Sequence, residues 1–102
     1  MADFLLLMHD TGLDAGDGTI LPAMWDAYLE RLQSAGVMRG GSRIAGGACF
    51  RKSGEVPAIA EHIGGYIKIE VTDLEAAKGW LTGNPVYERG GIVEIRDLPR
   101  DA

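Results

Sequence analysis

Two histidines, His9 and His62, are the side chains of this sequence best suited to general acid–base catalysis. His9 ends an apolar stretch and is followed directly by Asp10, so a carboxylate-oriented general base is one interpretation of this pair. Adjacent residues of a strand point to opposite faces, so this pair can interact only where the chain turns. His62 follows Glu61 in a predicted loop at a strand end, where it either borders a cleft or is simply solvated.

Four charged side chains fall on one face of a predicted sheet: Lys68, Glu70, Glu94 and Arg96. Arg96 can hold a carboxylate in bidentate fashion, so Lys68 and Arg96 are candidates for binding a small organic anion. The alternative is that the four residues form ion pairs that fix the register of a dimer. The pattern favours this structural role.

Three aromatic residues, Trp25, Tyr28 and Trp80, fall on the apolar stripes of predicted helices. Such positions are typical of a hydrophobic core. Trp25 and Tyr28 have a second interpretation as the walls of a pocket, with Tyr28 as a candidate catalytic residue. Tyr66 shares a strand face with Lys68 and is a further candidate ligand contact.

No metal or cofactor is expected. The two histidines lack the spacing of metal ligands, such as His-x-x-x-His. The Gly-Gly pairs belong to neither a Gly-x-Gly-x-x-Gly nor a Gly-Lys-Ser loop, so no phosphate-binding motif is present. The formal net charge of −5 and the dispersed basic residues argue against nucleic-acid binding.

The sequence also favours a cytoplasmic location away from membranes. Cys49 is the single cysteine and cannot form an intramolecular disulfide, so nothing indicates an oxidising compartment. No apolar run approaches the roughly 20 residues of a membrane span. The N-terminal residues lack the basic region of a signal peptide.

Periodicity predicts one α+β domain over residues 1–102 with a ferredoxin-like order of elements. The predicted strands are Asp3–His9, Val37–Ile44, a short extra one at Ala48–Arg51, Tyr66–Val71 and Ile92–Leu98. The predicted helices are Pro22–Ala35 and a second that starts at a capping box, Thr72-x-x-Glu75, and runs to Leu81. Gly40 and Gly41 indicate a bulge in the second strand, and Asn84-Pro85 is predicted to break the chain.

Two helices cover only one face of such a sheet. The covered face is predicted to comprise Phe4, Leu6, Met8, Ile67, Ile69, Val71, Val93 and Ile95. The apolar residues left on the other face are Leu5, Leu7, Tyr66 and Ile92. Leaving them in water forfeits several kcal/mol at about 25 cal/mol per Å² of apolar area, so a homodimer that packs two such faces together is expected.

Several segments, in order, resemble the YCII-related (DGPF) family of small bacterial proteins. They are Phe4-Leu5-Leu6-Leu7-Met8, Trp25-x-x-Tyr28-Leu29-x-x-Leu32, Gly64-Gly65-Tyr66-Ile67-x-Ile69, Asp73-Leu74-x-Ala76-Ala77-x-x-Trp80 and Val93-Glu94-Ile95-Arg96. The resemblance implies a dimeric α/β-barrel with a cleft between sheet and helices. Relatives of the fold include lactone isomerases, monooxygenases and a dehydrochlorinase, and some family members are associated with sigma-factor modules.

The chain departs from this family in two places. The Asp-Gly-Pro-Phe signature is missing, and residues 55–61 occupy a shorter version of its loop, with Pro57 as the remnant. In one branch, a histidine of the first helix paired with an aspartate is the proposed catalytic dyad. Tyr28 stands at that histidine's position, and a tyrosine is a poor base at neutral pH. This departure argues against the chemistry of that branch.

Two functional hypotheses remain. In the first, a small dimeric enzyme or binding protein takes a small, carboxylated organic compound in a cleft between its elements. In the second, the chain is a non-catalytic accessory module, for example in sigma-factor regulation. A pocket beside the candidate residues favours the first hypothesis, and a solid core without a pocket favours the second.

Overall fold

The computed structural model describes residues 1–9 and 22–100. Asp10, the carboxylate considered above as a partner of His9, lies outside the described residues. The helices and strands follow in the order β1 (Ala2–His9), α1 (Pro22–Ser34), β2 (Met38–Arg43), β3 (Ile63–Val71), α2 (Leu74–Gly79), α3 (Pro85–Glu88) and β4 (Val93–Leu98).

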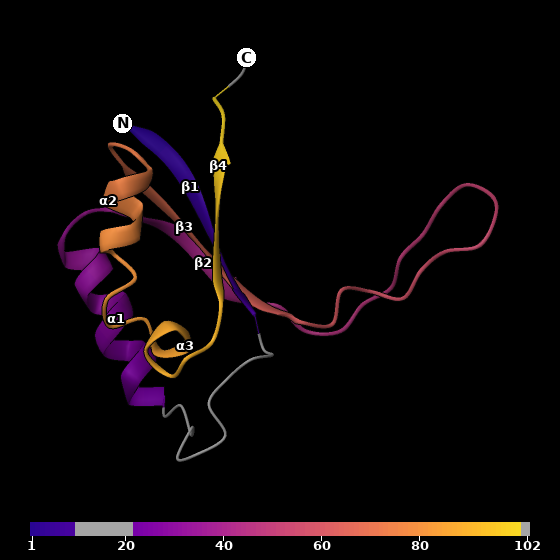
Figure 1. The fold of residues 1–102 in the computed structure, drawn as a ribbon, viewed down its shortest axis with the longest axis horizontal. Coiled ribbons are helices and arrows are strands. Elements are labelled where there is room, and N and C mark those ends of the chain that lie inside the picture. The colour runs from indigo at the N-terminus through magenta and orange to yellow at the C-terminus, as the bar shows by residue number, and fades with distance from the viewer. Residues whose placement is uncertain (10–21, 101–102) are drawn as a thin grey trace.

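The strands form a four-stranded sheet in the order β2-β3-β1-β4, and every neighbouring pair is antiparallel. The helices lie together on one side of this sheet (Figure 1). The predicted α+β fold with ferredoxin-like topology is therefore confirmed. Because successive side chains of a strand point to opposite faces, alternate residues of each strand face the helices or the uncovered side of the sheet.

The core lies between the sheet and the helices. Phe4, Leu6 and Met8 of β1 are buried, and so are Ile67 and Ile69 of β3. Val71 at the end of β3 and residues of the helices and loops complete the buried cluster: Tyr28, Leu32, Ala77, Leu81 and Val86. The predicted division of the strands into a covered and an uncovered face is confirmed, because Val93 and Ile95 also pack against this cluster.

Local signals explain where α1 ends and why β2 is irregular. Gly36 has a φ of +74°, the left-handed conformation that follows many helices and that glycine adopts without a Cβ clash. The predicted bulge is confirmed, because the register of β2 against β3 shifts between Met38 and Gly41. A Cβ at Gly41 would lie 2.8 Å from the carbonyl oxygen of Tyr66, so only glycine permits this close approach of the two strands.

Residues 44–62, which we call the arm, contain no helix or strand. The predicted short strand at Ala48–Arg51 is therefore wrong. The arm leaves the sheet between β2 and β3 and projects far from the rest of the chain (Figure 1). A strand requires backbone hydrogen bonds to a neighbouring strand, and residues 45–59 of the arm make no backbone–backbone hydrogen bond with a described residue.

Two predictions near the second helix also need correction. Asp73, not Thr72, caps α2: its Oδ1 accepts a hydrogen bond from the backbone N–H of Ala76 at 2.9 Å. Aspartate at this position competes with the neighbouring threonine as a cap. Asn84-Pro85 does not simply break the chain, because Asn84 caps the short helix α3 and Pro85 occupies its first turn.

Candidate functional site

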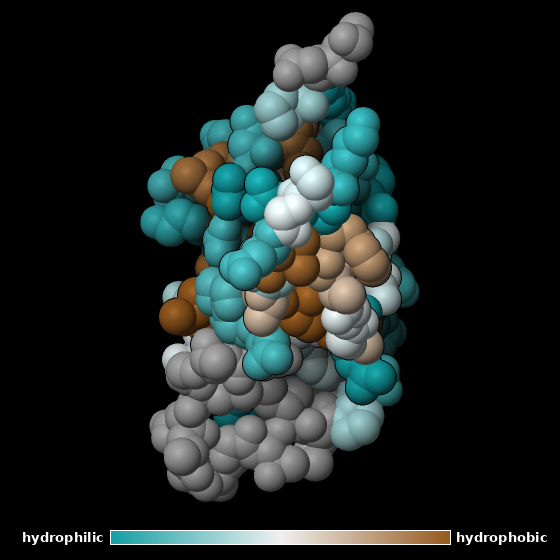
Figure 2. Space-filling view, turned by 90° about the vertical axis from the view of Figure 1, so that its right-hand side faces the viewer, coloured by the Kyte–Doolittle hydropathy of each residue, from teal (hydrophilic) through white to brown (hydrophobic). Residues whose placement is uncertain are grey.

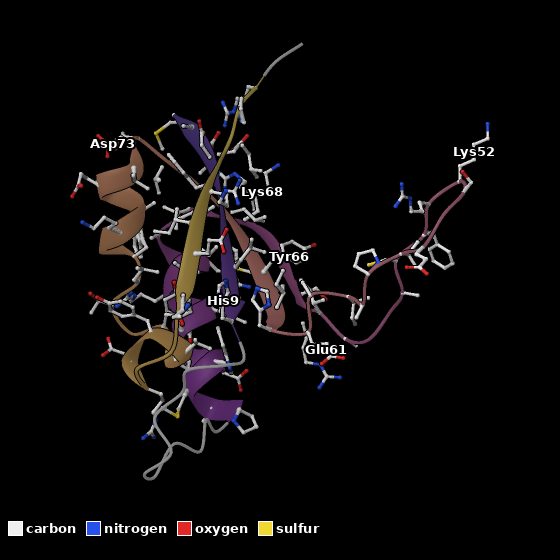
Figure 3. The ribbon with its side chains drawn as sticks, turned by 45° about the vertical axis from the view of Figure 1, so that its right-hand side comes forward. His9, Lys52, Glu61, Tyr66, Lys68 and Asp73 are labelled. Atoms are coloured by element: carbon white, nitrogen blue, oxygen red, sulfur yellow. The ribbon has the colours of Figure 1, made fainter. Side chains whose placement is uncertain are left out.

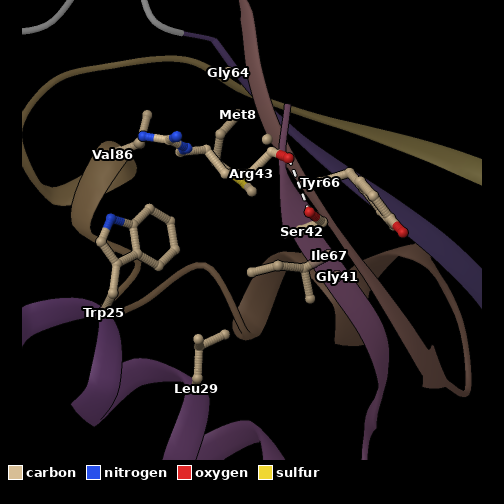
Figure 4. Close-up of a pocket in the computed structure, with 11 residues that line it drawn as sticks. Met8, Trp25, Leu29, Gly41, Ser42, Arg43, Gly64, Tyr66, Ile67 and Val86 are labelled. Carbon is tan, nitrogen blue, oxygen red and sulfur yellow. Dashed lines mark hydrogen bonds between the residues drawn. The ribbon is translucent and has the colours of Figure 1, made fainter. Parts of the chain in front are cut away.

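A pocket of about 420 Å³ opens between α1, α3 and the sheet, at the end where β2 and β3 join the arm. Trp25 and Leu29 of α1 form one wall, with Val86 of α3 nearby (Figure 4). The remaining lining comes from the strands: Met8, Gly41, Ser42, Arg43, Gly64, Gly65, Tyr66 and Ile67. The lining is mostly apolar.

Glycines on the helix-covered face explain why the sheet is hollow here. Gly65 belongs to the same alternating set as Ile67 and is buried, but it contributes no side chain to fill the space. Gly41 pairs with Ile67, and Arg43 pairs with Gly65, so these residues of β2 share that face. The pocket therefore forms where the core face of two neighbouring strands lacks large apolar side chains.

Arg43 is the charged residue of the described lining. Its side chain reaches from β2 toward Val86, and Trp25 lies across the pocket from it (Figure 4). Its guanidinium has no ion pair or hydrogen bond with any residue that the structure describes. An unpaired guanidinium beside an aromatic wall and an apolar floor is suited to hold a planar organic anion.

Tyr28 lies in the core next to this pocket. Its side chain is 3% exposed, and its hydroxyl donates a hydrogen bond to the carbonyl oxygen of Trp80 at 2.7 Å. Burial raises the pKa of the Tyr28 hydroxyl above its ordinary value. Its ring meets that of Trp25 edge to face, with centroids 6.1 Å apart. This geometry is that of a residue that packs in the core. The catalytic role of Tyr28 stays a prediction.

A second group of candidates meets on the uncovered face of the sheet. His9 Nε2 lies 3.0 Å from Glu94 Oε1, and Glu94 Oε2 accepts a hydrogen bond from Arg96 at 2.9 Å. The rings of His9 and His62 lie edge to face with centroids 4.8 Å apart. Arg96 first, and then His9, lower the pKa of the Glu94 carboxyl group. The carboxylate beside His9 is thus Glu94, a pairing that the sequence analysis did not make.

The other end of this face carries an ion-pair network. Arg100 donates two hydrogen bonds of 2.8 Å to the carboxylate of Asp3 and also bonds to Glu70. Arg39 donates to the other oxygen of Glu70 at 2.8 Å. Lys68 makes no ion pair with a described residue, although it lies close enough to lower the pKa of Asp3 together with Arg100.

The structure thus divides the predicted site residues between two faces. His9, His62 and Arg96 come together on the uncovered face, where Tyr66 and Lys68 also point (Figure 3). Trp25 alone among them offers its side chain to the pocket, since Tyr66 turns its ring away and contributes backbone (Figure 4). Arg43 was missed. Arg43 lies two residues after the bulge marked by Gly40 and Gly41, and this position is the sequence signal that could have pointed to it.

Neither a metal-binding cluster nor a membrane-spanning helix is found in the described residues. No group of three or more His, Cys, Asp and Glu side chains in residues 1–9 and 22–100 is placed to hold a metal ion. Over the same part of the chain, no helix has the length and apolar character needed to cross a membrane.

Comparison with known proteins gives a fold-level relative and a family. The solved structure of 5-chloro-2-hydroxyhydroquinone dehydrochlorinase (TftG) from Burkholderia phenoliruptrix AC1100, in complex with 2,5-dihydroxybenzoquinone, is similar with a TM-score of 0.59 and 15% sequence identity. The similarity covers 97% of this chain and 95% of that one, and at this identity it shows a shared fold. No curated protein matches the chain. Residues 3–99 match the profile of the YCII-related domain, and the chain belongs to the YCII-related domain family.

Proposed function

We propose that this protein binds a small, ring-containing organic anion in the pocket between α1, β2 and β3, and that it does so as a homodimer. The observation that carries this proposal is the guanidinium of Arg43, which has no partner among the described residues and stands at a mostly apolar pocket with Trp25 as one wall. An existing pocket favours the small-molecule hypothesis over that of an accessory module with a solid core.

The size and chemistry of the pocket define the ligand class. A volume of about 420 Å³ lies near the lower end of the range for small-molecule sites, which suits a single substituted ring. Trp25 offers a flat face for stacking, and Met8 and Ile67 supply an apolar floor. Arg43 can bind a carboxylate or an ionised ring hydroxyl through paired N–H groups.

The fold-level relative supports the same ligand class. Its structure contains 2,5-dihydroxybenzoquinone, a six-membered ring with acidic hydroxyl groups. A compound of this kind has the flat ring and the anionic oxygens that Trp25 and Arg43 are suited to hold. This agreement concerns the type of compound only, and the reaction of the relative is not transferred to this chain.

The dimeric part of the proposal rests on the uncovered sheet face. Leu5, Leu7 and Tyr66 are only partly buried there, and Ile92 is 53% exposed. A second copy that packs the same face against this one buries all four residues symmetrically. The proposed interface also takes in the polar cluster of His9, Glu94 and Arg96, which lies on that face.

The binding proposal is tested by calorimetric titration with 2,5-dihydroxybenzoquinone, benzoate and an uncharged benzene derivative. Arg43→Met removes the charge but keeps an apolar side chain, and we expect it to weaken anion binding about tenfold or more, as for the loss of a charged hydrogen bond. Arg43→Lys should bind with intermediate affinity because it lacks the planar fork.

Arg96→Met is the matched control, since it removes an arginine from the opposite face of the sheet. We expect it to leave anion affinity unchanged. If anion binding depends on Arg96 and not on Arg43, the binding site lies on the uncovered face instead. Equal affinity for charged and uncharged rings in every variant would refute the role of Arg43.

A further inference from the structure

The arm, residues 44–62, has the features of a segment that needs a partner. Its base is anchored by a hydrogen bond from the N–H of Ile44 to the carbonyl oxygen of Gly64 at 2.9 Å. Its tip is a turn in which Arg51 donates to the carbonyl oxygen of Glu55 at 3.0 Å and Gly54 has a φ of +92°. Between base and tip the two halves run alongside each other (Figure 1).

The arm has little to hold it within its own chain. Among the described residues, no backbone–backbone hydrogen bond joins residues 45–59 to any other segment. Fixing a backbone costs about 1–2 kcal/mol per residue, and loops of this length without secondary structure are uncommon unless they function or are disordered. Contacts outside the chain are the natural source of the stabilisation that this extended shape requires.

Apolar side chains of the arm are left in water. Phe50 is 89% exposed, Val56 is 44% exposed and Ile44 is 37% exposed. Cys49 and Ile59 add further apolar surface to the same segment. An exposed phenylalanine near the tip of a projecting loop is a typical anchor residue of a protein interface.

The direction of the arm favours a second copy of the chain as its partner. The helices lie on one side of the sheet, and the arm projects on the other, which is the side of the uncovered face (Figure 1). Seen from that side, with the arm pointing toward the viewer, hydrophobic residues lie in the middle of the view and hydrophilic residues lie above and beside them (Figure 2). A second copy packed on the uncovered sheet face would therefore lie beside the arm of the first.

We propose that the arm clasps the second copy in the homodimer, with Phe50 as the anchor, so that two symmetric arms hold the two sheets together. This inference rests on the dimer proposed above. Half of the arm, roughly nine extended residues, spans about 30 Å, whereas packed sheets lie about 10 Å apart. The arm of one copy is therefore long enough for Phe50 to reach across the partner's sheet.

The arm carries no net charge of its own. Within the arm, Arg51 and Lys52 balance Glu55 and Glu61, so the remaining residues carry the whole net charge of −5. Lys52 stands at the far tip (Figure 3).

Photo-crosslinking tests the contact directly in the intact protein. Phe50→p-benzoylphenylalanine keeps an aromatic ring at the tip and forms covalent bonds with its neighbours on irradiation. A mixture of isotopically heavy and light chains distinguishes bonds between copies from bonds within one copy. We expect heavy–light crosslinked dimers that map to a second copy. The control, Tyr87→p-benzoylphenylalanine, places the same group on α3 at a residue that is 48% exposed, and should give none.

Sedimentation of Phe50→Ser, with Tyr87→Ser as the control, gives the second readout. We expect Phe50→Ser to weaken dimerisation at least tenfold and the control to leave it unchanged. A dimer that persists with unchanged affinity in Phe50→Ser, and that gives no crosslink from residue 50, overturns the arm contact while the sheet-face dimer stands. A wild-type chain that sediments as a monomer overturns both. Neither outcome affects the ligand titration with Arg43 variants.

Discussion

His9 Nε2 lies 3.0 Å from Glu94 Oε1 on the uncovered face of the sheet, although the two residues are 85 positions apart in the chain. Glu94 pairs across β1 and β4 with Leu7, so His9 is its diagonal neighbour on the same face. Arg96 holds the other carboxylate oxygen. The histidine, the carboxylate and the arginine therefore form one hydrogen-bonded row on the face that we assign to the dimer.

Glu94→Gln should lower stability at neutral pH and have less effect in acid. Arg96 and His9 hold the folded pKa of Glu94 below its ordinary value of 4.5. A depressed folded pKa gives stability that is present above the unfolded pKa and is lost as the pH falls through the folded pKa. The difference between the variant and the wild type should therefore shrink below pH 4.5. Urea denaturation over a pH series measures it.

Glu30→Gln is the matched control for this experiment, because Glu30 is an exposed residue of α1 with no hydrogen bond or ion pair to the described residues. It should change stability little at any pH. Parallel pH profiles for the two variants would contradict a specific contribution of the row formed by His9, Glu94 and Arg96.

Tyr28→Phe should destabilise the fold by about 1–2 kcal/mol, because it removes the hydroxyl that donates a partly buried hydrogen bond to the carbonyl oxygen of Trp80. The ring and its packing are kept, so the variant should fold and retain ligand affinity within about threefold. Thermal denaturation and calorimetric titration measure the two effects. Lost ligand affinity with unchanged stability would instead place the Tyr28 hydroxyl in the binding site.

Ile92→Glu should dissociate the proposed homodimer without unfolding the chain. Ile92 is 53% exposed in the single chain, so a carboxylate there is hydrated until a second copy covers it. Leu74→Glu, at a residue of α2 that is 50% exposed on the opposite side of the sheet, is the control and should leave the dimer intact. Light scattering of both variants at micromolar concentration is the measurement. Equal molecular masses in all three proteins would argue against this interface.

Asp73→Ala should cost about 1 kcal/mol as the loss of a helix N-cap, while Thr72→Ala should cost much less. The hydrogen bond from Ala76 N–H to Asp73 Oδ1 is the physical reason. Denaturant titration of both alanine variants compares them. A larger loss for Thr72→Ala would restore the capping box predicted from the sequence.

Much of the fold was predictable because it follows from local periodicity. The alternation of Phe4, Leu6 and Met8 predicted the covered face of β1, and Pro22 and Gly36 marked the limits of α1. These signals depend on residues a few positions apart, which experience the same strand or helix wherever it packs. The prediction of a short strand at Ala48–Arg51 was wrong because it also used local pattern alone. A local pattern does not show whether a neighbouring strand is present to accept the backbone hydrogen bonds.

The sequence by itself determined the topology, the core and the apolar uncovered face of this protein. Only the tertiary structure decided that His9 meets Glu94, that Arg43 stands at a pocket, and that the arm projects on the uncovered side. Each of these depends on the register and packing of strands distant in the chain. Residue types and spacing predict which face a side chain occupies, whereas its neighbours on that face are set by long-range pairing.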